Sequence, residues 1–204
     1  MQIKLMLLTI ISFLILKETE GQKWVQIESK NGAVLYTRAV SGSNIKEFKV
    51  EFEVEENIQT IVNMLKDVSN MHLWYDKIKI AKTLKEINDH SGIYHLEFSI
   101  PFPFTNRWTT VKGEYAISND KKTAHFSSKY EPYTSTINHD GLTHVTSLKS
   151  SWEITAVSPK KCKVTHIAFM DPSGNIPTWA INDGVEKGPF RTVEGMKKLL
   201  TRYR

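Results

Sequence analysis

The sequence predicts an α+β fold in which a long C-terminal helix covers one face of a strongly curved antiparallel β-sheet. Three observations carry this prediction: charged and apolar residues alternate strictly over 47–55, six further strand candidates follow between turn residues, and an apolar stripe at helical spacing follows Pro177. A sheet with one apolar face needs a covering layer, which the last helix supplies. The 204 residues, 40% hydrophobic and 24% charged, suit one globular domain.

The first elements are predicted as a hairpin followed by a helix. In 47–55 the apolar side chains should face a core and the charged ones water, and 32–40 is the expected hairpin partner across the turn 41–44. Asn57 can cap a helix that ends near 69–70 and packs one face on the sheet. Its apolar positions are Ile58, Ile61, Val62, Leu65 and Val68.

Six strands should follow, each bounded by turn residues such as Asn119-Asp120 and Asp140-Gly141. Their approximate ranges are 78–87, 92–100, 107–118, 122–131, 143–155 and 162–170. Alternation along them predicts which side chains face the interior. These are Leu96, Phe98, Ile100, Thr109, Val111, Gly113, Tyr115, Phe126, Tyr130, Leu148, Trp152 and Ile154. Gly113 should leave room in the wall.

The same residue types suit a packed core and a ligand cavity, so alternation alone leaves both open; the aromatic content tilts slightly toward a pocket. On 162–170 both faces look buried. His166 lies there, and its plainest role is a hydrogen-bonded core side chain.

The last helix is predicted to begin at Pro177 and to run toward Arg204. Gly184, Gly188 and Pro189 oppose a straight helix, at about 1 kcal/mol for each glycine and about 3 kcal/mol for the proline relative to alanine. A kink is therefore expected near 188–190. Such a kink would make the helix less stable than the sheet and able to act as a lid. A bend with a purely structural role fits the sequence equally.

Composition and motifs disfavour several function classes. Cys162 is the only cysteine, which excludes an internal disulfide, and it is expected to be a small buried strand residue. The seven histidines never fall at spacings such as H-E-x-x-H, and no nucleophile elbow or phosphate loop is present. No cofactor, metal or catalytic residue is predicted, although a histidine site assembled from separate strands stays open.

The formal net charge of +5 comes from basic residues scattered among acids, with loose groups at 77–85 and 197–204. The simplest explanation of these basic residues is a solvent-exposed face of the protein. Weak attraction to anionic lipid headgroups is the sharper alternative, and nucleic acid is disfavoured because no binding motif accompanies the charge.

Residues 1–21 are predicted to be a signal peptide, with 22–204 as the mature domain. The apolar run Leu5–Leu16 follows Lys4 and is too short to cross about 30 Å of hydrocarbon. A cut after Gly21 would yield an exported protein, periplasmic or extracellular. An uncleaved N-terminal anchor is the alternative.

Two stretches, PFPFTNR at 101–107 and DPSGNIPTW at 171–179, lie in order and are separated by strands. They are similar to the PFP-x-x-N-R and DPGG-x-IP-x-W stretches of the START family, the steroidogenic-acute-regulatory-protein-related lipid-transfer domains. The resemblance extends from about Lys23 to Tyr203. It implies a helix-grip fold, in which the curved antiparallel sheet wraps around the long C-terminal helix and a tunnel between them takes one lipid or similar hydrophobic molecule. It implies no catalytic residue.

The chain departs from the family pattern at two positions. Trp108 stands where the family usually has an acid, so an ion pair of Arg107 would have to recruit another acid such as Glu97 or Glu114. Several lipid-binding members carry a charged residue midway along the next strand. Its counterpart here lies near Gly113, so a phosphate- or hydroxyl-reading role is not carried over to that position.

Alternation and resemblance together predict a lipid-binding or lipid-transfer protein; phospholipid, sterol, isoprenoid and fatty acid all fit an apolar cavity. The lid helix and the 101–106 loop would move to admit the ligand, and Trp179 would plug the base of the helix. The predicted lipid-binding residues are Trp74, Leu96, Phe98, Arg107, Val111, Tyr115, Phe126, Leu148, Trp152, His166, Trp179, Asn182, Val185 and Met196.

The expected partners are a hydrophobic small molecule or lipid and, transiently, an anionic membrane surface, with the protein a monomer. The alternative function is an enzyme acting on an apolar small molecule, since helix-grip proteins include cyclases and hydrolases. That alternative requires acid and base groups that converge in the cavity, with Glu97 and His166 as the residues to test.

Overall fold

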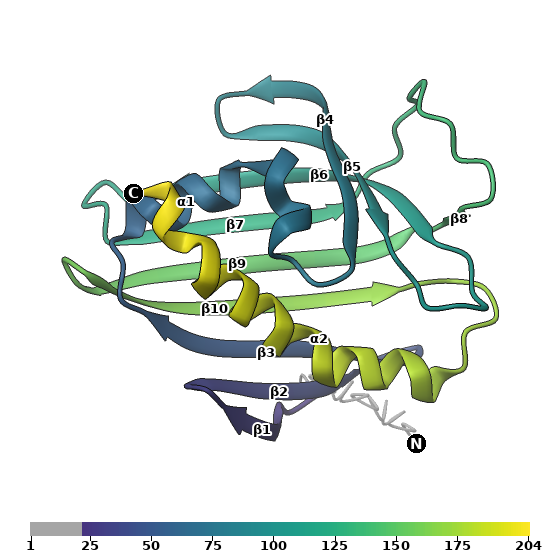
Figure 1. Ribbon diagram of the computed structural model, residues 1–204, viewed down its shortest axis with the longest axis horizontal. Coiled ribbons are helices and arrows are strands. Elements are labelled where there is room, and N and C mark those ends of the chain that lie inside the picture. Colours follow the sequence, from purple (N-terminus) through teal and green to yellow (C-terminus); the bar gives the residue numbers. More distant parts are fainter. Residues whose placement is uncertain (1–21) are drawn as a thin grey trace, which may run out of the picture.

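The computed structural model describes residues 22–204, and the predicted signal peptide lies outside the described residues. One ten-stranded sheet has the order β1-β2-β3-β10-β9-β7-β6-β5-β4, with β8 paired to β6 off this path. The strands are β1 (Val25–Lys30), β2 (Ala33–Val40), β3 (Ser43–Val54), β4 (Ile78–Asn88), β5 (Ser91–Phe98), β6 (Arg107–Ile117), β7 (Thr123–Tyr130), β8 (Thr143–His144), β9 (Ser147–Ser158) and β10 (Lys161–Asp171). Figure 1 shows the curved sheet with the helices on one face, as the sequence predicts.

The helices are α1 (Ile58–Lys66), the 3₁₀ helix η1 (Val68–Leu73), α2 (Thr178–Leu199) and the short η2 (Leu200–Tyr203). Asn57 caps α1 as predicted: its side-chain oxygen accepts a hydrogen bond from the Thr60 amide at 3.0 Å. Pro177 precedes the first turn of α2, and Pro189 lies inside this helix. The ribbon of α2 changes direction near its middle, in agreement with the expected kink (Figure 1).

Three local predictions are corrected. The first helix ends at Lys66 rather than near 69–70, and η1 follows it. The expected strand 143–155 is two strands, because β8 pairs in parallel with β6 before β9 begins. Strand β1 was not predicted, and every residue in it is exposed. Its apolar alternation is limited to Val25 and Ile27, and both side chains are exposed on this edge strand.

The core lies between the sheet and the helical layer. The largest fully buried side chains there include Leu35, Ile61, Met64, Ile154 and Met196. Cys162 is buried on β10, as expected. Helix α2 approaches η1 so closely that a Cβ built on Gly195 would lie 2.4 Å from the Trp74 carbonyl oxygen. No helix within residues 22–204 is long and apolar enough to cross a bilayer.

The outer face of the sheet is also covered at one end. Trp108 stacks on His139 with ring centroids 3.4 Å apart and on His144 at 4.1 Å. Beneath them His95 is fully buried, 3.0 Å from the Glu97 carboxylate. The segment 131–146 therefore acts as a strap over β5 and β6, and Glu97, expected to face away from the interior, is buried under it.

A second outward carboxylate is buried by ion pairing. Glu47 is only 2% exposed, although alternation predicted that it faces water. Arg38 approaches one of its oxygens at 2.5 Å and Lys149 the other at 2.9 Å. Arg38 comes from the adjacent strand β2 and Lys149 from β9, on the far side of β10, and together they offset the cost of removing this carboxylate from water.

Candidate functional site

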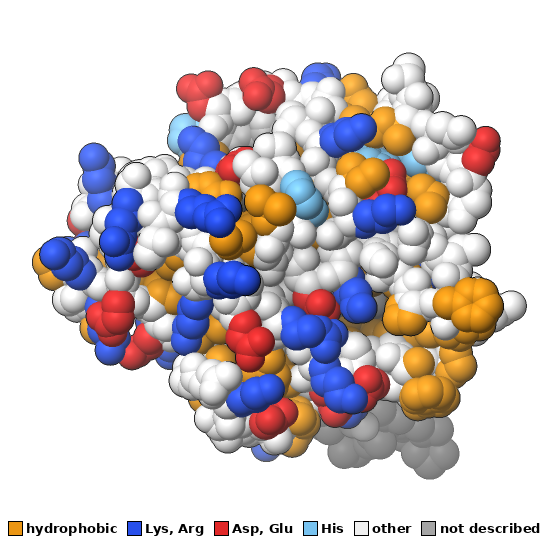
Figure 2. Space-filling model, viewed as in Figure 1, with side chains coloured by type: hydrophobic (Ala, Val, Ile, Leu, Met, Phe, Trp, Pro, Cys, Tyr) orange, Lys and Arg blue, Asp and Glu red, His pale blue; other side chains and the backbone are white. Residues whose placement is uncertain are grey.

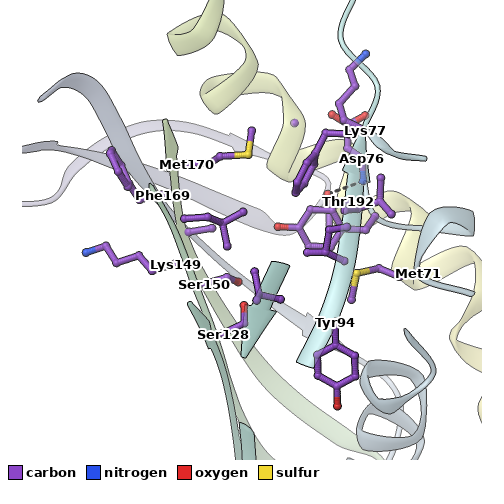
Figure 3. A pocket seen from close by; sticks show the side chains of 18 of the residues that line it. Met71, Asp76, Lys77, Tyr94, Ser128, Lys149, Ser150, Phe169, Met170 and Thr192 are labelled. Carbon is purple, nitrogen blue, oxygen red and sulfur yellow. Dashed lines mark hydrogen bonds between the residues drawn. The ribbon is translucent and has the colours of Figure 1, made fainter. Parts of the chain in front are cut away.

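A cavity of about 870 Å³ lies between the concave face of the sheet and the helical layer. Its wall combines strands β3 to β7, β9 and β10 with α1, η1, the 99–104 loop and α2; Figure 3 shows part of the lining. At liquid density this volume corresponds to on the order of thirty water molecules. That is far more than the small voids of a packed core, so the inward-facing residues enclose a cavity.

The floor of the cavity is shaped by two rows of residues that cross the sheet at right angles to the strands. Cross-strand pairing joins the first row neighbour to neighbour: Val50, His166, Trp152, Phe126 and Tyr115. The second row is Phe48, Ala168, Ser150, Ser128, Gly113 and Gly92. Paired residues share a face of the sheet, so the first row forms a bulky ridge. The small residues beside it leave the depression.

Stacked rings make the ridge rigid. The His166 and Trp152 rings lie 3.7 Å apart and nearly parallel, and Phe126 stacks on Tyr115 at 5.1 Å. Phe48 packs its ring against His166 at 5.0 Å, edge to face. Such packing fixes the ring orientations and gives the cavity a stiff wall on this side.

Gly113 does not leave empty room, contrary to the prediction. A Cβ on Gly113 would lie 2.8 Å from a ring carbon of Tyr94, and one on Gly92 would lie 2.8 Å from the Tyr94 hydroxyl. The Tyr94 ring therefore lies over both glycines and forms the wall there. Figure 3 shows the Tyr94 side chain among the lining residues. Burial raises the pKa of Tyr94, so its hydroxyl is neutral.

A neutral polar cluster interrupts the apolar wall. His166 Nε2 lies 3.1 Å from Ser150 Oγ and 3.4 Å from Tyr75 Oη, and both neighbours line the cavity. His166 Nδ1 is buried without a partner. Burial lowers the pKa of His166 to about 3. It also raises the pKa of Tyr75, so both groups are uncharged at neutral pH.

Two of the cations at the cavity, Arg191 and Lys149, are paired with acids, whereas Lys66 and Lys77, which also line it, form no ion pair among residues 22–204. Asp76 accepts two hydrogen bonds from Arg191, both at 2.9 Å, and its amide donates to Thr192 Oγ1 at 3.1 Å. These contacts join the end of η1 to α2, and Figure 3 shows the last of them. Lys149 is engaged by Glu47 at 2.9 Å.

Aromatic side chains surround the end of the cavity near the start of α2. Phe104 and Trp179 line it, and Trp179 is 75% exposed. Phe102, at the tip of the neighbouring loop, is 96% exposed. Figure 2 shows hydrophobic side chains gathered at this end of the molecule. Trp179 is therefore at the surface rather than a buried plug.

Arg107 holds the two motif stretches together. Its Nε donates to the Pro172 carbonyl and its Nη2 to the Ser173 carbonyl, both at 2.9 Å, and Nη1 donates to the Thr105 carbonyl. The guanidinium is buried and bound by carbonyl oxygens rather than by Glu97 or Glu114. Arg107 therefore has a structural role: its hydrogen bonds join the 101–106 loop to the turn before α2.

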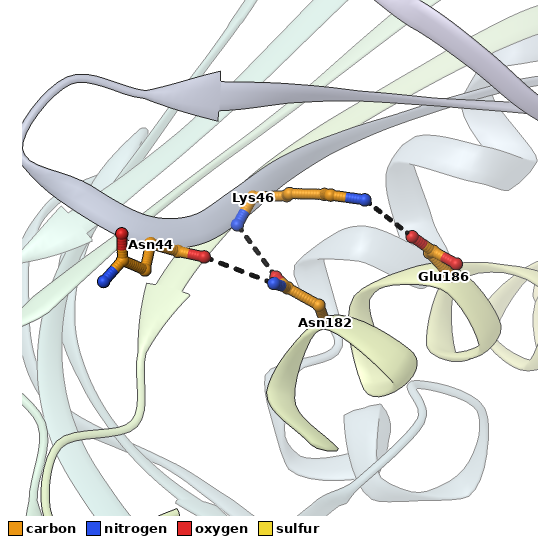
Figure 4. Close-up of polar contacts among 4 residues, drawn as sticks. All are labelled: Asn44, Lys46, Asn182 and Glu186. Atoms are coloured by element: carbon orange, nitrogen blue, oxygen red, sulfur yellow. Dashed lines mark hydrogen bonds and ion pairs between the residues drawn. The ribbon is translucent and has the colours of Figure 1, made fainter. Parts of the chain in front are cut away.

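Asn182 fastens the first half of α2 to β3. Its side-chain oxygen accepts from the Lys46 amide at 3.0 Å, its amide donates to the Asn44 carbonyl at 3.2 Å, and Lys46 Nζ lies 2.9 Å from Glu186 (Figure 4). We call these contacts the latch. Asn182 thus holds the helix instead of forming the cavity wall.

The structure separates the predicted binding residues into four groups. On the cavity wall lie Leu96, Phe98, Val111, Tyr115, Phe126, Leu148, Trp152, Trp179 and Val185. His166 lies against the wall, where it contacts Ser150 and Tyr75. Trp74 and Met196 belong to the core, and Arg107 and Asn182 make the structural contacts above. Ligand contact by any of them stays a prediction.

Sequence reasoning missed several wall residues, among them Tyr75, Tyr94, Ser128 and Ser150. The serines share the alternation of Phe126 and Trp152, so counting every second residue regardless of polarity would have found them. Tyr130 was also predicted to face inward. Its ring packs edge to face against the ring of His144, which belongs to the strap, with the ring centroids 5.7 Å apart.

The residues named for an enzymatic alternative do not converge. Glu97 faces the strap on the outer side of β5, whereas His166 lies beside the cavity on the inner side of β10. Among residues 22–204 there is no cluster of three or more histidine, cysteine or acidic side chains that could hold a metal ion.

Comparison with known proteins finds matches along almost the whole chain. The family model of the START domain matches residues 12–204. Mouse START domain-containing protein 10 is 22% identical over 185 residues, which are 86% of this chain but only 60% of that protein. Rat phosphatidylcholine transfer protein is 27% identical over 194 residues, covering 90% of this chain and 86% of that protein.

Solved structures share the fold. The STAR-related lipid transfer protein of Xanthomonas axonopodis superposes with a TM-score of 0.78 at 24% identity, covering 87% of this chain and 98% of that chain. Human StAR-related lipid transfer protein 5 gives a TM-score of 0.80 at 13% identity, covering 92% and 89%. The predicted arrangement of a curved sheet around a C-terminal helix is thereby confirmed.

Proposed function

From the premise that the chain belongs to the START domain family, we propose that it binds one hydrophobic ligand in the cavity and transfers it between membranes. The observation that carries the proposal is the 870 Å³ cavity with its largely apolar wall. Each Å² of apolar ligand surface removed from water contributes about 25 cal/mol. A lipid-sized guest therefore gains enough to leave solution, provided that few of its polar groups are buried unpaired.

Native mass spectrometry of the purified protein, followed by extraction and identification of bound lipid, tests this proposal. One ligand per chain is expected after incubation with a broad lipid panel. Ser128→Phe should abolish uptake, because its ring would fill the row of small residues. Ser147→Phe is the matched control, since Ser147 is exposed on β9. A protein that takes up no lipid from the panel would overturn the proposal.

Transfer requires contact with a bilayer, and exposed Phe102 and Trp179 beside the cavity are suited to enter its interface. Figure 2 shows many Lys and Arg side chains on the face that carries α2, interspersed with acids. We expect weak binding to vesicles that contain anionic lipid, reduced by salt. Sedimentation with vesicles should show that Phe102→Ser with Trp179→Ser lowers binding. Unchanged binding would refute this role for the two aromatics.

The proposed function is non-enzymatic, so the ligand should be recovered chemically unchanged. The opposite placement of Glu97 and His166 supports this part of the proposal. Incubating the protein with an extracted lipid and measuring its mass over hours is the test. Turnover that disappears in His166→Gln would contradict it and favour an enzyme.

Export and a monomeric state complete the proposal. The apolar run Leu5–Leu16 supports export, and the N-terminus of the exported protein should be Gln22. Intact mass of the secreted or periplasmic fraction tests this, with Leu8→Arg expected to block export. Light scattering after size-exclusion chromatography should give the mass of one chain.

A further inference from the structure

The polar groups of the cavity floor are hydroxyls next to a neutral imidazole. Ser150 and Ser128 are direct cross-strand partners in the row of small residues, and both point into the cavity in Figure 3. Tyr75 lines the cavity from the opposite, helical layer. His166 links the layers, with Nε2 3.1 Å from Ser150 Oγ and 3.4 Å from Tyr75 Oη.

We propose that this cluster of Tyr75, Ser150 and His166 selects an uncharged lipid that carries a free hydroxyl group. The inference rests on the proposed lipid-binding function and names the ligand class for the same cavity. Sterol-like, ceramide-like and diacylglycerol-like molecules share this chemistry. The rest of the wall would accept their apolar bodies.

The hydrogen-bonding capacity of the cluster leaves room for one hydroxyl. A neutral imidazole nitrogen is either a donor or an acceptor, so Nε2 cannot satisfy both hydroxyls equally well. The Ser150 contact is shorter, and the longer Tyr75 contact leaves the phenol free to donate elsewhere. A ligand hydroxyl between the two can accept from Tyr75 and donate to Ser150 Oγ, which completes a continuous chain of hydrogen bonds.

The charge distribution disfavours an anionic headgroup at this depth. No charged side chain occupies either of the two rows on the floor, and His166 is held neutral by burial. Among the other cations that line the cavity, Arg191 is paired with Asp76 and Lys149 with Glu47, whereas Lys66 and Lys77 form no ion pair among residues 22–204. A phosphate in hydrogen-bonding contact with Ser150 and His166 would therefore exchange its hydration for groups that carry no charge, which is unfavourable.

The test measures uptake from phosphatidylcholine vesicles by native mass spectrometry. Cholesterol, a ceramide and a diacylglycerol are compared with the O-methyl ether of each, and phosphatidylcholine and phosphatidylglycerol are scored in the same spectra. We expect at least one hydroxyl lipid to bind about 3- to 10-fold more tightly than its ether, the range of one net hydrogen bond. Tyr75→Phe and Ser150→Ala should each remove that preference, so that each variant binds the alcohol and its ether with equal affinity.

Ser147→Ala, on the exposed part of β9, is the matched control and should keep the preference. Thermal unfolding of each variant checks the fold, and Ser150→Ala with Ser128→Ala replaces Tyr75→Phe where that variant does not fold. Uptake of phospholipid in preference to every hydroxyl lipid, or equal binding of alcohols and ethers, would overturn the inference and leave the lipid-binding function standing. Failure to bind any lipid would overturn both.

Discussion

Replacing Gly195 with alanine should destabilise the protein, whereas the same replacement at Gly184, in the same helix, should stabilise it. Alanine is about 1 kcal/mol more favourable than glycine inside a helix, so propensity alone predicts a gain at both positions. The surroundings differ. A Cβ at Gly184 meets nothing within 4 Å, whereas one at Gly195 would lie 2.4 Å from the Trp74 carbonyl oxygen and 3.0 Å from two further backbone atoms.

The magnitude follows from that contact. A backbone carbonyl cannot rotate away, so α2 and η1 must separate, which costs about 3 kcal/mol, the upper part of the usual range for overpacking. After the gain of about 1 kcal/mol from helix propensity, Gly195→Ala should lose about 2 kcal/mol and Gly184→Ala should gain about 1. For a chain of this length the melting temperatures should differ by about 6–12 °C.

Urea and thermal unfolding, followed by circular dichroism, measure the difference. Bound lipid must be extracted first, because Gly184 lines the cavity and a ligand would shift both transitions. If the free energies of unfolding of the two variants agree within about 1 kcal/mol, the close approach of α2 to Trp74 does not restrict the size of the residue at position 195.

Three further predictions concern the buried imidazole and the two polar anchors of α2. The pKa of His166 is about 3 in the folded protein against 6.5 normally, so the unfolded chain binds the proton first and stability falls as pH drops below about 6.5. Urea titrations should show about 2 kcal/mol lost at pH 5 relative to pH 7, and a His166→Phe variant with the same loss would refute the assignment. Arg107→Lys should cost about 1–3 kcal/mol, measured by thermal unfolding, because an ammonium cannot reach all three carbonyls; an unchanged melting temperature would contradict this. Asn182→Ala should open the latch and speed lipid exchange between vesicles several-fold, with under about 1 kcal/mol of stability lost; unaltered exchange kinetics would argue against a gating role.

The sheet and the inward-facing residues could be predicted from the sequence because both follow from local alternation. Phe98, Val111, Phe126 and Trp152 all lie on the cavity wall, as their positions in the strands indicate. The apolar stripe after Pro177 indicated the closing helix. Alternation alone could not predict that the interior is a cavity, because apolar side chains suit a packed core equally well; only the resemblance to the START family implied it.

The failures share a cause: each depends on contacts between segments far apart in the chain. Glu97 is buried because the strap 131–146 returns over β5, and Glu47 because Arg38 and Lys149 converge on it. Trp179 looks like a core residue by type, yet its place beside the cavity leaves it exposed. Alternation predicts which face a side chain takes, and only the tertiary structure determines what covers that face.

The row of small residues on the cavity floor makes ligand capacity a property of strand register. Ala168, Ser150, Ser128 and Gly113 come from four strands and form one depression only while these strands stay in their present pairing. A slip of one residue in β9 would turn Ser150 to the outer face and bring a neighbouring side chain inward. A misregistered chain would therefore lose its binding volume along with its core, so ligand uptake reports on correct folding of the sheet.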